Sequence, residues 1–335
     1  MRRNVAAQRD QDAHGAARRR VPPKAGVGTL RAPPAGRHAP CDRRHAATEV
    51  QDRAVPEPEA VLPPRTASLV DQHLAVSQRI AYEDLDFAQA KAVGLTAREI
   101  DNLGFFADIE SQTVFYFLEV APLKVARDPE LLAFLTMWNY EELFHARAIS
   151  ALLAACGVDV LPSTERTTAV RAAAQRKAYV EDVFQRSLAR VMPRTFVALW
   201  MFWGALQEAL TAQAYEQVLR TTPNPVLAEL FRRITKQERR HFAFYYAQAR
   251  ARLDGDVVAQ RIVKTIAERF FAPVGSGVKS PAELATRMGR IFPDGRLAEI
   301  AVVVDQRMAQ LPGMTGFAAV QRWVASLPAT HADAA

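Results

Sequence analysis

Cysteine is scarce in this chain, which has only Cys41 and Cys156 among its 335 residues. The two are far apart, so the sequence carries no disulfide framework and no cysteine cluster of the kind that binds structural zinc or an iron–sulfur centre. Long apolar runs are also missing. The longest, residues 195–206, is closed by a Gln-Glu pair, and it falls short of the ~18 residues that span a membrane. We therefore expect a soluble, cytoplasmic protein.

Strand patterns are absent as well. No segment alternates apolar and polar residues as a half-buried β-strand does, whereas apolar residues recur at helical spacing from about residue 67 onward. The sequence therefore predicts an all-α fold. The expected helices span residues 67–92, 96–121, 129–156, 163–191, 194–220, 225–253, 256–272, 281–291, 295–310 and 315–326.

An excess of one charge is missing from most of the chain. Residues 1–66 hold thirteen Lys and Arg against seven Asp and Glu, and the rest of the chain holds thirty against twenty-nine. The overall charge of +7 is therefore no argument that the fold binds nucleic acid. Residues 1–66 are rich in Arg, Pro and Ala, and we expect a disordered extension, with an Arg-rich transit peptide as the alternative. Residues 67–255 are expected to form a helical bundle, and residues 256–328 a C-terminal helical extension packed on it.

Two copies of the pattern Glu-x-x-His stand out, at Glu142–His145 and at Glu238–His241. Residues three apart share one face of a helix, so each copy can offer a carboxylate and an imidazole to one metal ion. Two such pairs, with one Glu from each of two other helices, form the ligand set of di-iron and di-manganese carboxylate bundles. A single copy arises easily by chance, so the interpretation depends on what surrounds the two copies.

The expected helix starts place both copies at the same depth. Residues 128–129 are Asp-Pro and residues 224–225 are Asn-Pro, and each pair combines an N-cap residue with proline at the first helical position. Glu142 and Glu238 each lie thirteen residues after the proline of their own helix. Both are therefore ~20 Å into their helices.

Two further glutamates lie at matching distances before each turn. Glu110 is twelve residues before Pro122, and Glu208 is thirteen before Thr221. Residues equidistant from the turn of an antiparallel helix hairpin meet at one level, so each should lie beside one motif. Glu119 is rejected because it is nearer the turn and on the opposite face. The expected metal ligands are Glu110, Glu142, His145, Glu208, Glu238 and His241.

Four carboxylates and two imidazoles favour iron or manganese over metals that prefer soft ligands. We expect two iron ions per chain, with manganese as the alternative. Glu142 and Glu238 would bridge the ions, and Glu110 and Glu208 would each bind one of them. Glu141 is interpreted as a solvated neighbour, with the orientation of an imidazole as its alternative role.

Two more residues near the ligands are candidate catalytic groups. Thr211 lies one turn past Glu208 on the same face, where it could hydrogen-bond an oxygen-derived intermediate or relay a proton. The alternative for Thr211 is a hydrogen bond back to the preceding turn. Trp138 could carry electrons to the metals, or it could be a packed core indole. Aromatic residues flank Glu110 and precede Glu208, and they either line a substrate channel or belong to the core.

This pattern resembles the soluble acyl-acyl carrier protein desaturases of the ferritin-like superfamily. The matching residues around the ligands are Trp138, Glu141, Gln207, Glu208, Thr211, Arg239 and Arg240. Two features depart from the family, which has Asp at the position of Gln237 and a longer gap between Glu110 and Glu142. The resemblance covers roughly residues 96–250.

The resemblance implies a ferritin-like four-helix bundle with a crossover helix. It also implies an O₂-dependent di-iron oxidase or oxygenase that acts on an organic substrate. The partners would be O₂, a hydrophobic or acyl-carrier-bound substrate, an electron donor such as ferredoxin, and a second copy of the chain. Alternative interpretations are a ferritin- or rubrerythrin-like iron oxidase or peroxide scavenger, a di-iron N-oxygenase, and a helical scaffold without catalytic activity.

Overall fold

The computed structural model describes residues 68–120, 123, 128–160, 186–276 and 280–327. All regular secondary structure in these residues is helical, which confirms the predicted all-α class. The extension over residues 1–66 and most of the predicted helix over residues 163–191 lie outside the described part, although residues 186–191 are helical. The helices are α1 (Leu69–Leu74), α2 (Phe87–Val93), α3 (Ala97–Glu110), α4 (Thr113–Val120), α5 (Pro129–Ala155), α7 (Pro193–Thr221), α8 (Pro225–Leu253), α9 (Val257–Phe270), α10 (Pro281–Ile291), α11 (Arg296–Met308) and α12 (Ala319–Ser326).

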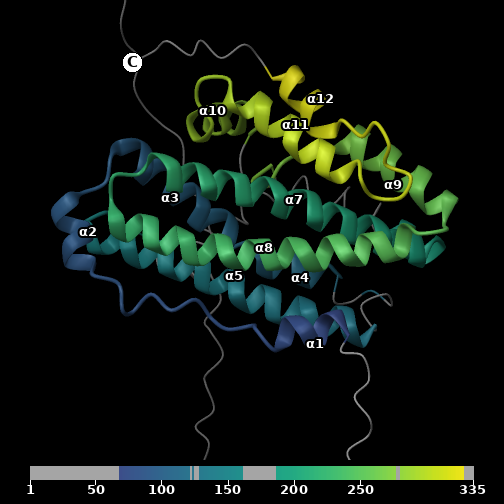
Figure 1. The fold of residues 1–335 in the computed structure, drawn as a ribbon, viewed down its shortest axis with the longest axis horizontal. Coiled ribbons are helices and arrows are strands. Elements are labelled where there is room, and N and C mark those ends of the chain that lie inside the picture. The colour runs from purple at the N-terminus through teal and green to yellow at the C-terminus, as the bar shows by residue number, and fades with distance from the viewer. Residues whose placement is uncertain (1–67, 121–122, 124–127, 161–185, 277–279, 328–335) are drawn as a thin grey trace, which may run out of the picture. The chain divides into compact units, whose positions relative to one another are not determined.

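Two helical hairpins form the centre of the fold (Figure 1). In the first, α3 and α4 pack against α5, and in the second α7 packs against α8. The hairpins meet where α5 contacts α8, and the short helices α1 and α2 contact both of these long helices. The apolar side chains of the two hairpins belong to one continuous buried cluster.

Both long helices that carry a Glu-x-x-His motif begin where the sequence predicts. The Asp128 carboxylate caps α5 by accepting hydrogen bonds from the main-chain N–H groups of residues 130 and 131. The Asn224 side chain does the same for α8 with residues 226 and 227. Asn224 also donates to the carbonyl oxygens of Ala90 and Gly94, which ties the start of α8 to the end of α2.

The predicted single helix over residues 96–121 is interrupted. Its predicted capping box at Thr96 is present, but α3 ends at Glu110 and α4 begins only at Thr113. At the break, Ser111 Oγ donates to the Asp108 carbonyl oxygen at 2.8 Å, and Thr113 Oγ1 donates to the Glu110 carbonyl oxygen at 2.9 Å. These hydroxyl groups compete for the carbonyl groups that a continuous helix would use.

The prediction of one continuous helix over residues 67–92 is also wrong for the middle of this segment. It consists of α1 and α2, and residues 75–86 between them are not helical. The main chain of Gln78 in this connection bonds to side chains of the long helices instead. Its N–H donates to Glu141 Oε1 at 3.1 Å, and its carbonyl oxygen accepts from Gln237 Nε2 at 2.6 Å. We call residues 75–86 the strap.

The remaining helices cover the second hairpin on the side of α7. Helices α9 and α11 contact α7, α10 contacts α3 and α7, and α12 contacts α9 and α11. Helices α9 to α11 agree with the sequence, while α12 begins later than predicted, at Ala319. None of the helices in the described part of the chain combines the length and the apolar character that a membrane span requires.

Candidate metal centre

The structure brings the side chains of all six predicted ligands together between the two hairpins. They come from four helices, and each of the six residues is at most 7% exposed. Glu110 closes α3, Glu208 lies in α7, and the two motifs lie in α5 and α8. The sequence predicted this convergence from helix starts and turns, while the role of these side chains as metal ligands remains a prediction.

The six residues form two overlapping groups, each with four ligand atoms that lie within 4.8 Å of one another. The first group is Glu110, Glu142, His145 and Glu238. The second group is Glu142, Glu208, Glu238 and His241. Glu142 and Glu238 belong to both, so the geometry offers two adjacent cation positions that share two carboxylates.

Both imidazoles turn Nδ1 toward the shared carboxylates. The Nδ1 atom of His145 lies 3.1 Å from an oxygen of Glu142 and 3.0 Å from an oxygen of Glu238. The Nδ1 atom of His241 lies 2.8 Å from Glu142 and 3.5 Å from Glu238. The Nε2 atoms therefore face away from the carboxylate cluster.

Each Nε2 atom meets the residue that precedes the glutamate of the other motif. Glu141 Oε2 lies 2.6 Å from His241 Nε2, and Gln237 Oε1 lies 2.7 Å from His145 Nε2. An oxygen acceptor at this distance holds a proton on Nε2 and leaves the Nδ1 lone pair free for a metal. Glu141 is completely buried, so its interpretation as a solvated neighbour is wrong and the alternative, an orienting partner, fits.

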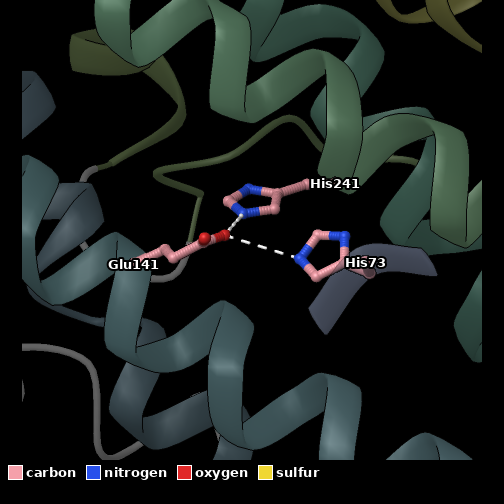
Figure 2. Close-up of side chains that lie close together, drawn as sticks. All are labelled: His73, Glu141 and His241. Carbon is pink, nitrogen blue, oxygen red and sulfur yellow. Dashed lines mark hydrogen bonds and ion pairs between the residues drawn. The ribbon is translucent and has the colours of Figure 1, made fainter. Parts of the chain in front are cut away.

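A third histidine, which the sequence did not single out, lies on the outer side of Glu141. His73 belongs to α1, and its Nε2 atom lies 3.5 Å from Glu141 Oε2 (Figure 2). Its ring packs edge-on against Phe134, and it is 5% exposed. His73, Glu141 and His241 could also form a three-ligand group. However, the Glu141 oxygens already accept hydrogen bonds from Ser77 Oγ at 2.8 Å, from the Gln78 N–H and from His241 Nε2, whereas His73 Nε2 makes no hydrogen bond within the described residues.

The strap fixes the partners of both imidazoles. Gln78 donates its N–H to Glu141 and accepts from Gln237 Nε2 through its carbonyl oxygen. The second contact decides the orientation of the Gln237 amide, because its NH₂ group faces the carbonyl and its oxygen must face His145. A single main-chain residue therefore holds the acceptors of both histidines.

The two glutamates that are not shared each receive a hydrogen bond from a buried aromatic side chain. Trp138 Nε1 donates to Glu208 Oε1 at 2.9 Å, and the Tyr215 hydroxyl donates to Glu110 Oε1. Trp138 is 7% exposed and belongs to the core, so it is both a packed indole and a direct partner of a candidate ligand. Tyr215 was not predicted from the sequence, because it lies far from Glu110 in the chain and no local pattern indicates the contact.

Burial controls the electrostatics of the unshared glutamates. It raises the pKa of Glu110 and of Glu208 well above the usual value, and the neighbouring shared carboxylates raise both further. Burial would also raise the pKa of Glu142, but the two imidazoles lower it well below the usual range. Burial opposes protonation of the imidazoles, yet the surrounding carboxylates raise the pKa values of His145 and His241.

The residues fit a pair of divalent cations. Among the described residues, the buried atoms Glu142 Oε1, Glu238 Oε1 and His241 Nδ1 make no hydrogen bond, although Glu142 Oε1 lies 2.8 Å from His241 Nδ1 and Glu238 Oε1 lies 3.0 Å from His145 Nδ1. Buried polar atoms rarely remain unpaired, and these three belong to predicted ligands. The pKa directions mean that protons balance the carboxylates in the metal-free protein, whereas two divalent cations would balance four carboxylates without them.

A small apolar cavity is lined by residues that are close in sequence to two of the predicted ligands, although no ligand lines it. Its lining includes Ile109, next to Glu110, and Thr211, one turn after Glu208. The volume open to the centre of a water molecule is about 20 Å³, which is room for one or two water-sized molecules. Phe105 and Phe106 line the cavity and also belong to the buried core, as does Phe202.

Comparison with protein families, curated proteins and solved structures finds no match to this chain. The side chain of Glu119, the rejected alternative ligand, lies outside the described part of the chain.

Proposed function

We propose that this chain is an O₂-dependent, non-haem di-iron oxidoreductase that acts on an organic substrate in the manner of the acyl-acyl carrier protein desaturases. The observation that carries the proposal is the pair of overlapping four-ligand groups that share Glu142 and Glu238. In this proposal α3 with α4, α5, α7 and α8 form the four-helix bundle of the ferritin-like superfamily.

Each candidate residue has a defined place in the proposed centre. Glu110 and His145 would hold one ion, Glu208 and His241 the other, and Glu142 and Glu238 both. Carboxylate and imidazole ligands suit iron and manganese, and no thiolate is present in these groups to favour softer metals. A bound pair of ferrous ions supplies O₂ reduction and, through it, the oxidising power that removes hydrogen from a C–H bond.

In the proposal, residues around the ligands hold them in position and exclude water from the centre. Trp138 and Tyr215 keep the unshared carboxylates in place by donating hydrogen bonds, and the acceptors at Nε2 keep both imidazoles in the ligating tautomer. The surrounding apolar side chains exclude water from the ligands. In the proposal, the hydroxyl of Thr211, which belongs to the lining of the apolar cavity, would pass a proton to the Glu208 side of the centre.

The apolar lining of the cavity favours an apolar substrate. In the proposal, this substrate enters by displacing side chains that line the cavity. At about 20 Å³ it admits a molecule as small as O₂ but not an acyl chain. Met288, on α10, is part of its lining, and unbranched Met side chains rearrange more easily than other core residues. The side of the cavity that faces the C-terminal helices is therefore the proposed entrance for an acyl chain.

The proposal is tested by loading metal-free full-length protein with ferrous ion under anaerobic conditions and then exposing it to O₂. Iron content, O₂ consumption and visible absorption are recorded for the wild type and for Glu142→Ala and Glu238→Ala. Acyl-carrier-bound and free acyl substrates are then supplied with ferredoxin and reductant, and the products are analysed by mass spectrometry. We expect two irons per chain, a transient absorption lost in both variants, and an oxidised acyl product.

The other outcomes identify the alternatives. Rapid formation of ferric product with no effect of any organic substrate would indicate an iron oxidase. Oxidation of an aryl amine but of no acyl substrate would indicate an N-oxygenase. A wild-type protein that binds no iron would leave only the helical scaffold.

A further inference from the structure

The two Glu-x-x-His motifs differ at one matched position. The residue before each motif glutamate accepts a hydrogen bond from the histidine of the other motif, but it is Glu141 in α5 and Gln237 in α8. We infer that this difference makes the two cation positions unequal, so that the ion held by Glu208 and His241 binds more tightly than the ion held by Glu110 and His145. Glu141 is the positioning residue responsible, and the inference rests on the proposed metal centre.

The physical basis is the charge of the acceptor. A carboxylate that accepts from an imidazole N–H strengthens the other ring nitrogen as a metal ligand, and loss of such a partner typically costs 10–100-fold in metal affinity. Glu141 provides this carboxylate to His241 at 2.6 Å, in a completely buried position where a charge acts strongly. The neutral Gln237 amide orients His145 at a similar distance, 2.7 Å, but supplies no charge.

The other contacts of Glu141 and Gln237 fix which oxygen of each side chain faces a histidine. Glu141 Oε1 accepts from Ser77 Oγ and from the Gln78 N–H, which leaves Oε2 to His241. Arg240 lies 3.6 Å from Oε1 and His73 3.5 Å from Oε2, so cationic and polar groups support the carboxylate from its outer side. The hydrogen bond from Gln237 Nε2 to the strap carbonyl prevents the amide from turning.

Apart from the acceptor at Nε2, the two cation positions have similar ligands and similar hydrogen-bond donors. Each position contains the same two shared carboxylates, one unshared glutamate and one Nδ1 atom. Each unshared glutamate receives one hydrogen bond from a buried aromatic donor, Trp138 for Glu208 and Tyr215 for Glu110. The acceptor at Nε2 is thus the main chemical difference between the positions.

Two variants of the full-length protein isolate the positions, since each removes one unshared ligand. Glu110→Ala leaves the position of Glu208 and His241, and Glu208→Ala leaves the position of Glu110 and His145. Metal-free samples are titrated with Co²⁺, which is followed by calorimetry and by visible absorption. We expect the ion in Glu110→Ala to bind at least about tenfold more tightly than the ion in Glu208→Ala.

Glu141→Gln is then added to each variant. Glutamine carries no charge, so His241 loses the negative partner in either orientation of the new amide, and it also loses the correct tautomer where the NH₂ group faces Nε2. The affinity in Glu110→Ala should fall at least about tenfold, while the affinity in Glu208→Ala should stay within about twofold. Gln237→Met is the matched change at the other histidine, and it should weaken binding only in Glu208→Ala.

Several outcomes would overturn the inference. These are equal Co²⁺ affinities in the two single-position proteins, tighter binding in Glu208→Ala, or an equal loss on Glu141→Gln in both, which would indicate a merely structural role. Circular dichroism checks that each variant is folded, and if Glu141→Gln is not, the affinity order and the Gln237→Met result decide alone. Failure of the wild type to bind Co²⁺, Mn²⁺ or Fe²⁺ would instead refute the proposed centre itself.

Discussion

Trp138 on α5 donates a hydrogen bond of 2.9 Å from its indole nitrogen to Oε1 of Glu208 on α7. The two residues belong to different hairpins, so this bond links the hairpins through a candidate ligand. Trp138 lies one helical turn before Glu142, which places the donor beside the shared carboxylates as well. The indole therefore contributes to the shape of the centre whether or not it carries electrons.

Replacement of Trp138 tests this contact. Trp138→Phe keeps an aromatic ring but removes the donor, and it leaves a buried carboxylate oxygen short of a hydrogen bond. We expect the free energy of unfolding to fall by about 1–3 kcal/mol, as measured by urea denaturation, and Co²⁺ binding to weaken in Glu110→Ala. Trp323→Phe on α12 is the control, and an equal Co²⁺ affinity in the two Trp variants would contradict the prediction.

The shared carboxylates should control stoichiometry. Glu142→Gln and Glu238→Gln each remove a charge that belongs to both four-ligand groups, so the number of ions retained per chain should fall from two to one or none. Elemental analysis after Co²⁺ loading and desalting measures this number. Glu229→Gln, on the same helix as Glu238 but in a surface pair with Arg233, should retain two ions.

Removal of metal should make stability depend on pH. Glu110, Glu208 and both motif histidines have raised pKa values in the folded protein. A group whose pKa is raised on folding contributes stability that is complete below its unfolded pKa, ~4.3 for Glu and ~6.5 for His, and is lost as the pH rises. The metal-free protein should therefore melt at least about 3 °C lower at pH 8 than at pH 6.

The metal-loaded protein supplies the control for that measurement. Bound cations replace the protons, so its melting temperature should change much less over the same range. A metal-free protein whose melting temperature is constant or rises from pH 6 to pH 8 would show that these four groups do not hold their protons in the folded state.

A glycine contact tests the packing between α7 and α8. A Cβ atom at Gly204 would lie 2.5 Å from ring atoms of the buried Tyr245, so Gly204→Ala should lower the free energy of unfolding by about 1–3 kcal/mol. Gly289→Ala in α10 meets nothing within 4 Å and should raise it by about 0.5–1 kcal/mol. Thermal or urea denaturation of the two variants should therefore give opposite signs, and equal signs would refute the packing argument.

The sequence predicted most of what depends on helical geometry. The caps at Asp128 and Asn224 set where α5 and α8 begin, and a fixed rise per residue then sets the depth of Glu142 and Glu238. The turn rule added Glu110 and Glu208 without knowledge of any tertiary contact. Regular local rules were sufficient for Glu142, Glu208 and Glu238, which lie within continuous helices, whereas the count to Glu110 assumed a continuous helix that is interrupted directly after this residue.

The features that were not predicted depend on contacts between residues that are distant in the chain. The break after Glu110 has a local signal in retrospect, since the polar residues 110–113 interrupt an apolar stretch and include two hydroxyl groups that bond to the main chain. The strap has one local signal, Asp86, which caps α2, but the contacts of Gln78 depend on Glu141 and Gln237, which are distant in the chain. His73 was missed for the same reason, although a histidine on a short apolar segment is a residue to examine.

The contacts of Gln78 have a consequence for which sequence changes the protein can tolerate. Both contacts use main-chain atoms, and the Gln78 side chain itself is exposed. Substitution of this side chain, other than by proline, leaves the N–H and the carbonyl oxygen in place. An insertion or deletion between α1 and α2 would instead place a different peptide group opposite Glu141 and Gln237. Both histidines would then lose the orientation that these two side chains give them. Variation in this segment should therefore be limited in length far more than in composition.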